Sequence, residues 1–328
     1  MFKMFIKEKV KKAVSLIYFT FLKEIIERDT KLKAHKNIIF GKNCVIDPTA
    51  ILICGKNGVI EFEGGNYIGR NVEISANNSK ISLGSNTSIQ DRCIIVGDVE
   101  IGRYCLFSLN VLASSGRHYY ELKPEYYIKD QDLLVDNDVE LSKAHSRKII
   151  IEDDCWLGIN VAVMPGVKIG KGSVIGSNSV ITKSVEPYSI MAGSPAKLIK
   201  KRLIFELKDS LHYLVDADLP YFYSGFYTNV ESIKKDRKNG GIRAMGLFVV
   251  YLKHEGNNNI ILRIKKNIEG LVKIKYNNQI KEFNEVVFTD VSFMIENNPF
   301  HKFQLVTDSN NMIDENQNFI IVQSIKTT

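Results

Sequence analysis

The sequence is poor in cysteine, and its cysteines form no recognisable set. There are five, an odd number, at positions 44, 54, 93, 105 and 155, and no two follow a CxxC spacing. A zinc site or a disulfide framework would need paired or closely spaced cysteines. We therefore expect no bound metal and a reducing compartment, the cytoplasm.

Long hydrophobic runs are missing as well. The longest, residues 13–22, is interrupted by Ser15 and Thr20, and it is shorter than the roughly 20 apolar residues that span a bilayer. Lys23 and Glu24 follow it, where a signal peptide would carry small residues at its cleavage site. The sequence therefore predicts neither a transmembrane helix nor a signal peptide.

The chain has little net charge, only +7 over 328 residues, but its basic residues gather in two clusters. One lies within residues 3–12, and the other consists of Lys197, Lys200, Lys201 and Arg202. Each cluster either attracts phosphates or an anionic membrane, or is simply a solvated face. We expect no nucleic-acid partner.

Residues 1–35 are expected to form an amphipathic helix. Five apolar residues are spaced 4, 3, 4 and 4 apart, which places them on one helical face: Val10, Val14, Ile17, Phe21 and Ile25. Such a helix either caps the domain that follows or makes peripheral contact with the inner face of the cytoplasmic membrane.

What the sequence does contain is a repeat of six residues. Aliphatic residues recur without a break at Ile151, Leu157, Val163, Ile169, Ile175 and Ile181. Small or β-branched residues follow each of them at an offset of four, and the same pattern runs through residues 83–111 and begins near Ile39. A period of six matches neither an α-helix nor a heptad. It is typical of a solenoid with a triangular cross-section, in which three hexapeptides make one coil.

In such a coil the aliphatic residue points inward, and the small residue lies at a tight corner where glycine or asparagine tolerates unusual backbone angles. Cys93, Cys105 and Cys155 occupy the small-residue position. We therefore expect them to be packing residues and not nucleophiles. Stacked coils bury a continuous apolar core and need caps at both ends.

The repeat is interrupted by residues 114–148, a polar, tyrosine-rich loop that contains His118 and His145. Loops of this length in a compact domain usually have a function. After the loop come pieces that read W-L-G-x-x-V, P-G-V-x-I-G and A-G-x-P-A-K-x-I, all within residues 151–200. As an ordered set they resemble the hexapeptide-repeat O-acetyltransferases, the group of the galactoside and maltose acetyltransferases and of those acting on capsule and lipopolysaccharide sugars.

The resemblance covers residues 36–202 and implies a mainly β fold, a left-handed parallel β-helix. It also implies a homotrimer with an acetyl-CoA groove between neighbouring subunits. By position, the residues lining that groove or facing the coenzyme nucleotide are Trp156, Ser177, Thr182, Lys183, Lys197 and Lys200. Ile159 stands where the galactoside enzyme has a serine, so that contact is altered here.

The family's catalytic histidine corresponds to His118, which the pair Asn110-Val111 precedes at the family's distance. An imidazole suits the removal of a proton from a sugar hydroxyl as it attacks a thioester. Asn110 is a candidate substrate-binding residue. His145 matches no motif residue and is expected to be structural.

Residues 203–328 are not covered by the resemblance. We expect a short helix over 203–216 and then an antiparallel, β-sandwich-like domain, with strands near 246–253, 259–265, 270–276, 279–283, 285–295 and 318–325. An aromatic cluster at residues 221–227 either stacks on sugars or packs in a core or interface. Small-molecule acetyltransferases of the family tend to lack such a domain, which favours a polymeric or lipid-linked acceptor.

The expected reaction is transfer of acetyl from acetyl-CoA to a hydroxyl of a cell-surface polysaccharide, such as capsule or O-antigen, or of its sugar precursor. Three alternatives remain. One is N-acetylation of an amino-sugar nucleotide. Another is a zinc hydratase of the carbonic-anhydrase type, which would need three histidines, and the repeat region offers only His35, His118 and His145. The third is a scaffold without catalytic activity.

Overall fold

The computed structural model describes residues 37–327 except 56, 117, 139–140, 142–146, 207, 227, 229, 253–258, 268–271, 285–286, 295–299 and 308–318. The helix expected over 1–35 lies outside this part. The chain divides into two units, Met1–Ile204 and Phe205–Thr328. In the part that is described, no helix has the length and apolar character needed to cross a membrane.

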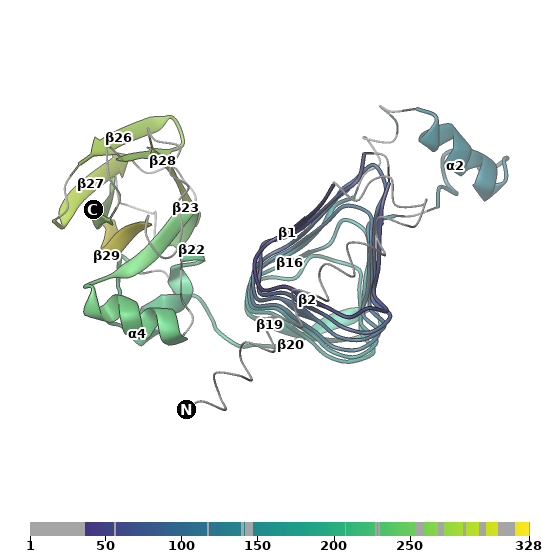
Figure 1. Ribbon diagram of the computed structural model, residues 1–328, viewed down its shortest axis with the longest axis horizontal. Helices are drawn as coiled ribbons and strands as arrows, with labels where there is room; N and C mark the ends of the chain where they lie inside the picture. Colours follow the sequence, from purple (N-terminus) through teal and green to yellow (C-terminus); the bar gives the residue numbers. More distant parts are fainter. Residues whose placement is uncertain are drawn as a thin grey trace, which may run out of the picture. The chain divides into compact units, whose positions relative to one another are not determined.

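The first unit is a parallel β-helix of short strands, which follow one another around the three sides of a prism (Figure 1). Sheet A contains β1 (Ile38–Phe40), β4 (Val59–Phe62), β7 (Lys80–Leu83), β10 (Val99–Ile101), β13 (Ile149–Ile151) and β16 (Lys168–Ile169). Sheet B contains β2 (Val45–Ile46), β5 (Tyr67–Ile68), β8 (Ser88–Ile89), β11 (Leu106–Phe107), β14 (Trp156–Leu157), β17 (Val174–Ile175), β19 (Ser189–Gly193) and β20 (Ala196–Lys201). Sheet C contains β3 (Ile51–Cys54), β6 (Glu73–Ala76), β9 (Ile94–Val96), β12 (Leu112–Ser114), β15 (Ala162–Val163) and β18 (Val180–Ile181).

The chain therefore runs from sheet A to B to C and back to A, and six such coils stack in parallel register. From Phe62 onward the six-residue period correctly predicted which side chains point inward. In the first coil it was wrong by one residue: Ile39, Val45 and Ile51 are 51–59% exposed, and Phe40, Ile46 and Leu52 pack against the core instead, because Ile39 is in register with the outward Glu61. All six aliphatic residues from Ile151 to Ile181 are at most 2% exposed. Cys93, Cys105 and Cys155 are equally buried, as expected of packing residues. Burial raises the pKa of the Cys93 thiol to about 11, which leaves it a poor nucleophile at neutral pH.

The corner between sheets B and C, the B–C corner, is built from residues with a left-handed backbone. Asn71, Arg92, Asn110, Asn160 and Asn178 all have φ between 52° and 61°. Asparagine is among the few residues other than glycine that adopt this conformation readily. The stack of positive φ values turns the chain sharply at the same point of successive coils.

The second unit is built on one antiparallel sheet, sheet D, in the order β26-β25-β28-β23-β29-β24-β27, with β21 against β29 and β22 against β23. Its strands are β21 (Ser210–His212), β22 (Ser224–Phe226), β23 (Ile242–Tyr251), β24 (Asn259–Asn267), β25 (Val272–Tyr276), β26 (Gln279–Phe283), β27 (Thr289–Met294), β28 (Phe300–Thr307) and β29 (Phe319–Thr327). A 3-10 helix, η3 (Asp216–Tyr221), and the α-helix α4 (Val230–Lys238) complete it.

Two expectations for this unit need correction. The helix predicted over 203–216 is wrong, because β21 lies there and pairs with β29, a partner far along the chain that overrides local propensity. The strands form one sheet and not a sandwich of two sheets, since alternation predicts strands but not their partners. Of the two roles left open for the aromatic cluster, core packing is the one observed for its described members, since Tyr221, Phe222, Tyr223 and Phe226 are buried.

Candidate functional site

The loop expected at residues 114–148 leaves the prism between β12 and β13, at the corner between sheets C and A. We call this corner the C–A corner and the extruded loop the arm. Figure 1 shows the arm, with its helix α2 (Ile128–Asp136), leaving the prism on the side away from sheet B. The Ser115 hydroxyl accepts a hydrogen bond from Asp98 N at 2.7 Å, and Gly166 N donates to Arg147 O at 2.9 Å. Both ends of the arm are therefore fixed to neighbouring coils.

His118 lies near the start of the arm and contacts a carboxylate of α2. Its Nδ1 is 2.7 Å from Asp132 Oδ2, and the other carboxylate oxygen accepts a hydrogen bond from Tyr119 N at 2.8 Å. The His118 side chain is 82% exposed. With Nδ1 engaged by Asp132, Nε2 is the nitrogen left for a substrate.

The carboxyl of Asp132 is held in its charged form. Burial alone would raise its pKa, but the hydrogen bonds from the Tyr119 amide and from His118 outweigh that effect and lower it. Sequence reasoning missed Asp132, because the arm has no period that would place a residue of α2 beside His118.

The arm has a small interior of its own. Gln131 and Val135 of α2 are 1% exposed. The Gln131 side chain accepts a hydrogen bond from Lys123 N at 3.0 Å and donates one to Tyr126 O at 3.1 Å. These contacts tie α2 to the segment that precedes it. Three tyrosines of the arm nevertheless keep at least half of their surface exposed: Tyr120, Tyr126 and Tyr127.

A second group of predicted residues lies on the outer face of sheet B. Trp156 is in register with Val174, Val174 with Ile190, and Ile190 with Lys200. Register partners on neighbouring strands point to the same side of a sheet. Trp156 and Lys200 therefore share one face, and Lys197 lies on the same strand as Lys200, paired with Ala192. Both lysines are exposed.

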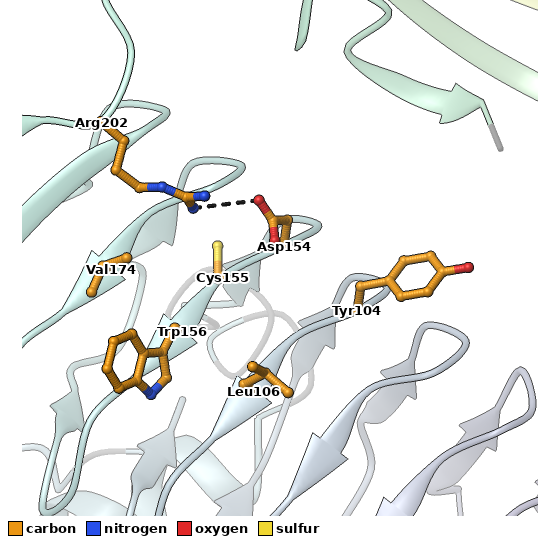
Figure 2. A pocket seen from close by; sticks show the side chains of 7 residues that line it. All are labelled: Tyr104, Leu106, Asp154, Cys155, Trp156, Val174 and Arg202. Carbon is orange, nitrogen blue, oxygen red and sulfur yellow. Dashed lines mark hydrogen bonds and ion pairs between the residues drawn. The ribbon is translucent and has the colours of Figure 1, made fainter. Parts of the chain in front are cut away.

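A pocket of about 340 Å³ opens beside Trp156. Figure 2 shows the indole next to Leu106 of the neighbouring strand, with Arg202 across the pocket in contact with Asp154 at 3.4 Å. The lining residues are Tyr104, Leu106, Asp154, Cys155, Trp156, Val174 and Arg202. The Trp156 ring is 51% exposed, and its Nε1 donates to Ser108 Oγ at 3.2 Å. The pocket thus combines apolar side chains with an ion pair between Arg202 and Asp154.

The remaining predicted residues lie at the corners. Ser177 is at the B–C corner, where its hydroxyl accepts a hydrogen bond from Ile159 N at 3.2 Å. Asn110 lies in the same corner, and its side chain is held between Arg92 Nε and Asn160 Oδ1, each at 2.9 Å. Those two contacts use one acceptor site and one N–H of the exposed amide, which leaves its second N–H and second lone pair for a substrate.

Thr182 and Lys183 follow β18 and lie exposed at the C–A corner, the same corner that carries the arm with His118. Within one subunit the predicted residues therefore form two main groups. One, with His118, Thr182 and Lys183, is at the C–A corner. The other, with Trp156 and the two lysines of β20, is on sheet B, the opposite side of the prism.

Among the described residues, no three His, Cys, Asp or Glu side chains lie close enough together to hold a metal ion. His35 and His145, two of the histidines that a zinc hydratase would need, lie outside the described residues. The structure therefore does not test the hydratase alternative.

Comparison with known proteins connects this geometry to a family. Residues 148–183 match the family model described as bacterial transferase hexapeptide (six repeats). A chloramphenicol acetyltransferase of Klebsiella aerogenes is 39% identical over 119 residues, which is 35% of this chain and 54% of that protein. Another, of Morganella morganii, is 60% identical over 52 residues, which is 16% of this chain and 25% of that protein.

The chain thus spans about half the length of the first relative and a quarter of the second. Among solved structures, the polySia specific acetyltransferase NeuO is 26% identical and covers 53% of this chain and 86% of its own, with a TM-score of 0.35. A TM-score this low adds nothing on function. The six-coil prism agrees with the matched repeats, and both support the resemblance of the β-helical unit to the hexapeptide-repeat transferases.

Proposed function

We propose that this protein transfers acetyl from acetyl-CoA to a hydroxyl of a cell-surface polysaccharide or of its sugar precursor. The observation that carries the proposal is the position of His118 on an arm of a hexapeptide β-helix. Its Nδ1 is bound to Asp132, and its side chain is open to solvent. The names of the relatives, chloramphenicol acetyltransferases, support acetyl as the transferred group.

The reaction needs two groups from the protein, a general base and a hydrogen-bond donor. Nε2 of His118 takes the proton of the acceptor hydroxyl as its oxygen attacks the thioester carbonyl. The oxyanion that forms needs a hydrogen-bond donor, most simply a backbone N–H at a coil edge. The thiolate of coenzyme A is a good leaving group, so no covalent enzyme intermediate is required.

The acetyl donor is proposed to lie between two subunits. The two groups of predicted residues lie on different sides of one prism, which favours a donor site that a neighbouring subunit completes. A neighbouring subunit that packs its sheet B beside the C–A corner would join them. Lys183, Lys197 and Lys200 are exposed and would face the coenzyme phosphates.

The outer faces of the prism support an assembly of this kind. Apart from the exposed Ile39 of β1, sheet A has ion pairs between coils on its outer face, Lys80 with Glu61 and Lys148 with Glu100, both at 2.7 Å. Sheets B and C instead present large apolar side chains that are 40–55% exposed, including Leu106 and Trp156 on B and Ile94 and Leu112 on C. Two apolar faces and one charged face suit a closed homotrimer, in which every subunit uses the same two faces.

The acceptor is proposed to be a glycan because of the arm. Tyr120, Tyr126 and Tyr127 are 58%, 50% and 84% exposed and belong to the same arm as His118. An exposed tyrosine offers a flat apolar ring and a hydroxyl, which together match the C–H face and the hydroxyls of a sugar ring. The N-terminal segment has two open roles, a cap on the β-helix or a contact with the inner face of the membrane, and the second role would bring the enzyme to lipid-linked glycans.

An acetyl-transfer assay with defined acceptors tests the proposal. Release of free coenzyme A is followed with a thiol reagent, using acceptors that carry only hydroxyl groups and an amino-sugar nucleotide. Acetyl attached to oxygen is removed by hydroxylamine, whereas acetyl attached to nitrogen is retained. We expect a hydroxylamine-labile product on the glycan. A stable amide on the amino sugar would replace the proposal with N-acetylation.

A further inference from the structure

We propose that Asp132 is a positioning residue for His118, one that fixes the ring's tautomer and orientation from the helix of the arm. This inference rests on the proposed role of His118 as the base. Asp132 lies 14 residues beyond His118 and touches it through Oδ2 at 2.7 Å. No other described side chain is shown in contact with the ring of His118.

The contact decides which nitrogen can act. A carboxylate only accepts hydrogen bonds, so Nδ1 of a neutral His118 must carry the proton and Nε2 must carry the lone pair. When Nε2 takes a proton from the acceptor, the resulting imidazolium is stabilised by the adjacent negative charge. Asp132 carries that charge at neutral pH, as an aspartate ordinarily does, and its hydrogen bonds from Tyr119 N and His118 lower its pKa further.

The arm holds Asp132 from two sides. Its Oδ1 accepts a hydrogen bond from Tyr119 N at 2.8 Å, which ties the carboxylate to the residue next to His118. On the same helix, the neighbouring Gln131 is buried and bonded to Lys123 N and Tyr126 O. The distance between His118 and Asp132 is therefore set by backbone contacts as well as by their own hydrogen bond.

The substitution Asp132→Asn distinguishes an effect on the tautomer of His118 from an effect on the fold of the arm. In Asp132→Asn, the amide oxygen can still accept from Tyr119 N, so the arm keeps that bond. The amide nitrogen then faces Nδ1 and can only donate to it, which favours the tautomer with the proton on Nε2. We expect kcat to fall by at least about 10-fold with little change in the acetyl-CoA KM.

Two variants of the same helix serve as controls. Asp130→Asn removes an equal charge from an exposed residue two positions away, and we expect wild-type kcat. Asp132→Glu restores a carboxylate and is expected to recover part of the activity. Thermal unfolding of all three should match the wild type, because each retains an acceptor for Tyr119 N or leaves it untouched.

Nuclear magnetic resonance of the full chain with ¹⁵N-labelled histidine reports the tautomer without any turnover. The His118 signals are assigned by their loss in His118→Gln. We expect Nδ1–H in the wild type and a shift toward Nε2–H in Asp132→Asn. An unchanged tautomer, or wild-type kcat in Asp132→Asn, would overturn the positioning role.

The result separates this inference from the proposed function. If His118→Gln abolishes transfer while Asp132→Asn does not impair it, His118 is the base and Asp132 does not position it. If His118→Gln retains full activity, His118 is not the base and both proposals fail.

Discussion

The side-chain amide of Asn160 donates a hydrogen bond to Asn178 Oδ1 at 2.9 Å, and both residues have a φ of 59°. Asn110 donates in the same way to Asn160. The B–C corner is thus a column of left-handed residues whose side chains bond to the next coil. This is why asparagine recurs there: it tolerates the backbone angle and supplies both a donor and an acceptor.

This column of asparagines predicts that two substitutions at position 160 lower the free energy of unfolding by different amounts. Asn160→Ala and Asn160→Gly both lose the bonds to Asn110 and Asn178. Only alanine is also strained by the positive φ, which costs about 1 kcal/mol more. Urea unfolding at one protein concentration should therefore rank the wild type as most stable, the glycine variant second and the alanine variant last. An alanine variant at least as stable as the glycine variant would contradict this account of the corner.

Lys171 predicts a dependence of stability on pH. It is only 8% exposed, and burial lowers its pKa from 10.5 to about 8, although Asp153 nearby acts in the opposite direction. Between about pH 8 and 10.5 the unfolded chain holds this proton and the folded chain does not, so the free energy of unfolding rises with pH.

The contribution is isolated by comparison with Lys171→Met, which has no group to titrate there. From pH 7 to 9.5, the free energy of unfolding of the wild type should rise relative to the variant by about 2 kcal/mol. Denaturant unfolding at both pH values measures it. A constant difference between the two proteins would show that Lys171 is not held in a dry environment.

Trp156 is the only tryptophan, so intrinsic tryptophan fluorescence reports one site. Its ring is 51% exposed in one subunit. If a neighbouring subunit or the coenzyme covers sheet B at this point, its emission should shift to the blue when subunits assemble or acetyl-CoA binds. Dilution and titration series measure the two effects separately. Emission that stays at the wavelength of an exposed indole in both series would exclude sheet B from the interface and from the coenzyme site.

The basic residues expected to face the coenzyme predict a salt effect. Lys197→Ala with Lys200→Ala, and separately Lys183→Ala, should raise the acetyl-CoA KM. The increase should be larger at low ionic strength, because exposed charges are screened by salt. Lys80→Ala is the matched control, since Lys80 pairs with Glu61 on the polar sheet A. If only the KM for the acceptor rose, these lysines would contact the acceptor, and their assignment to the coenzyme would be wrong.

The fold of the first unit could be predicted because a short repeat in the sequence determines each coil. Each inward residue, such as Ile169 or Ile175, repeats the same environment as the residue six positions earlier, so the period itself describes the coil. The second unit was predicted less well. Strand β28 was not predicted. Its buried residues His301 and Phe303 alternate with exposed ones, but a histidine is polar, so the sequence shows no alternation of apolar and polar residues there.

For the candidate site, the sequence could predict only those residues whose position matches a motif of the family. His118 and Trp156 follow from the repeat and its motifs. Asp132 does not, because its importance arises from the fold of the arm, and α2 has no single apolar stripe in its sequence that would predict it. The sequence also did not show the neighbours of Asn110: only the stacked coils place its side chain between Arg92 and Asn160, and its role in substrate binding stays a prediction.

The central claim, that His118 is the base of an acetyl transfer, is tested most directly by single-turnover kinetics of His118→Ala with acetyl-CoA and a glycan acceptor. We expect the transfer rate to fall by about 10²-fold or more while acetyl-CoA binding is retained. The same substitution at His145, which lies outside the described residues, should have far less effect. Wild-type transfer by His118→Ala would contradict the account.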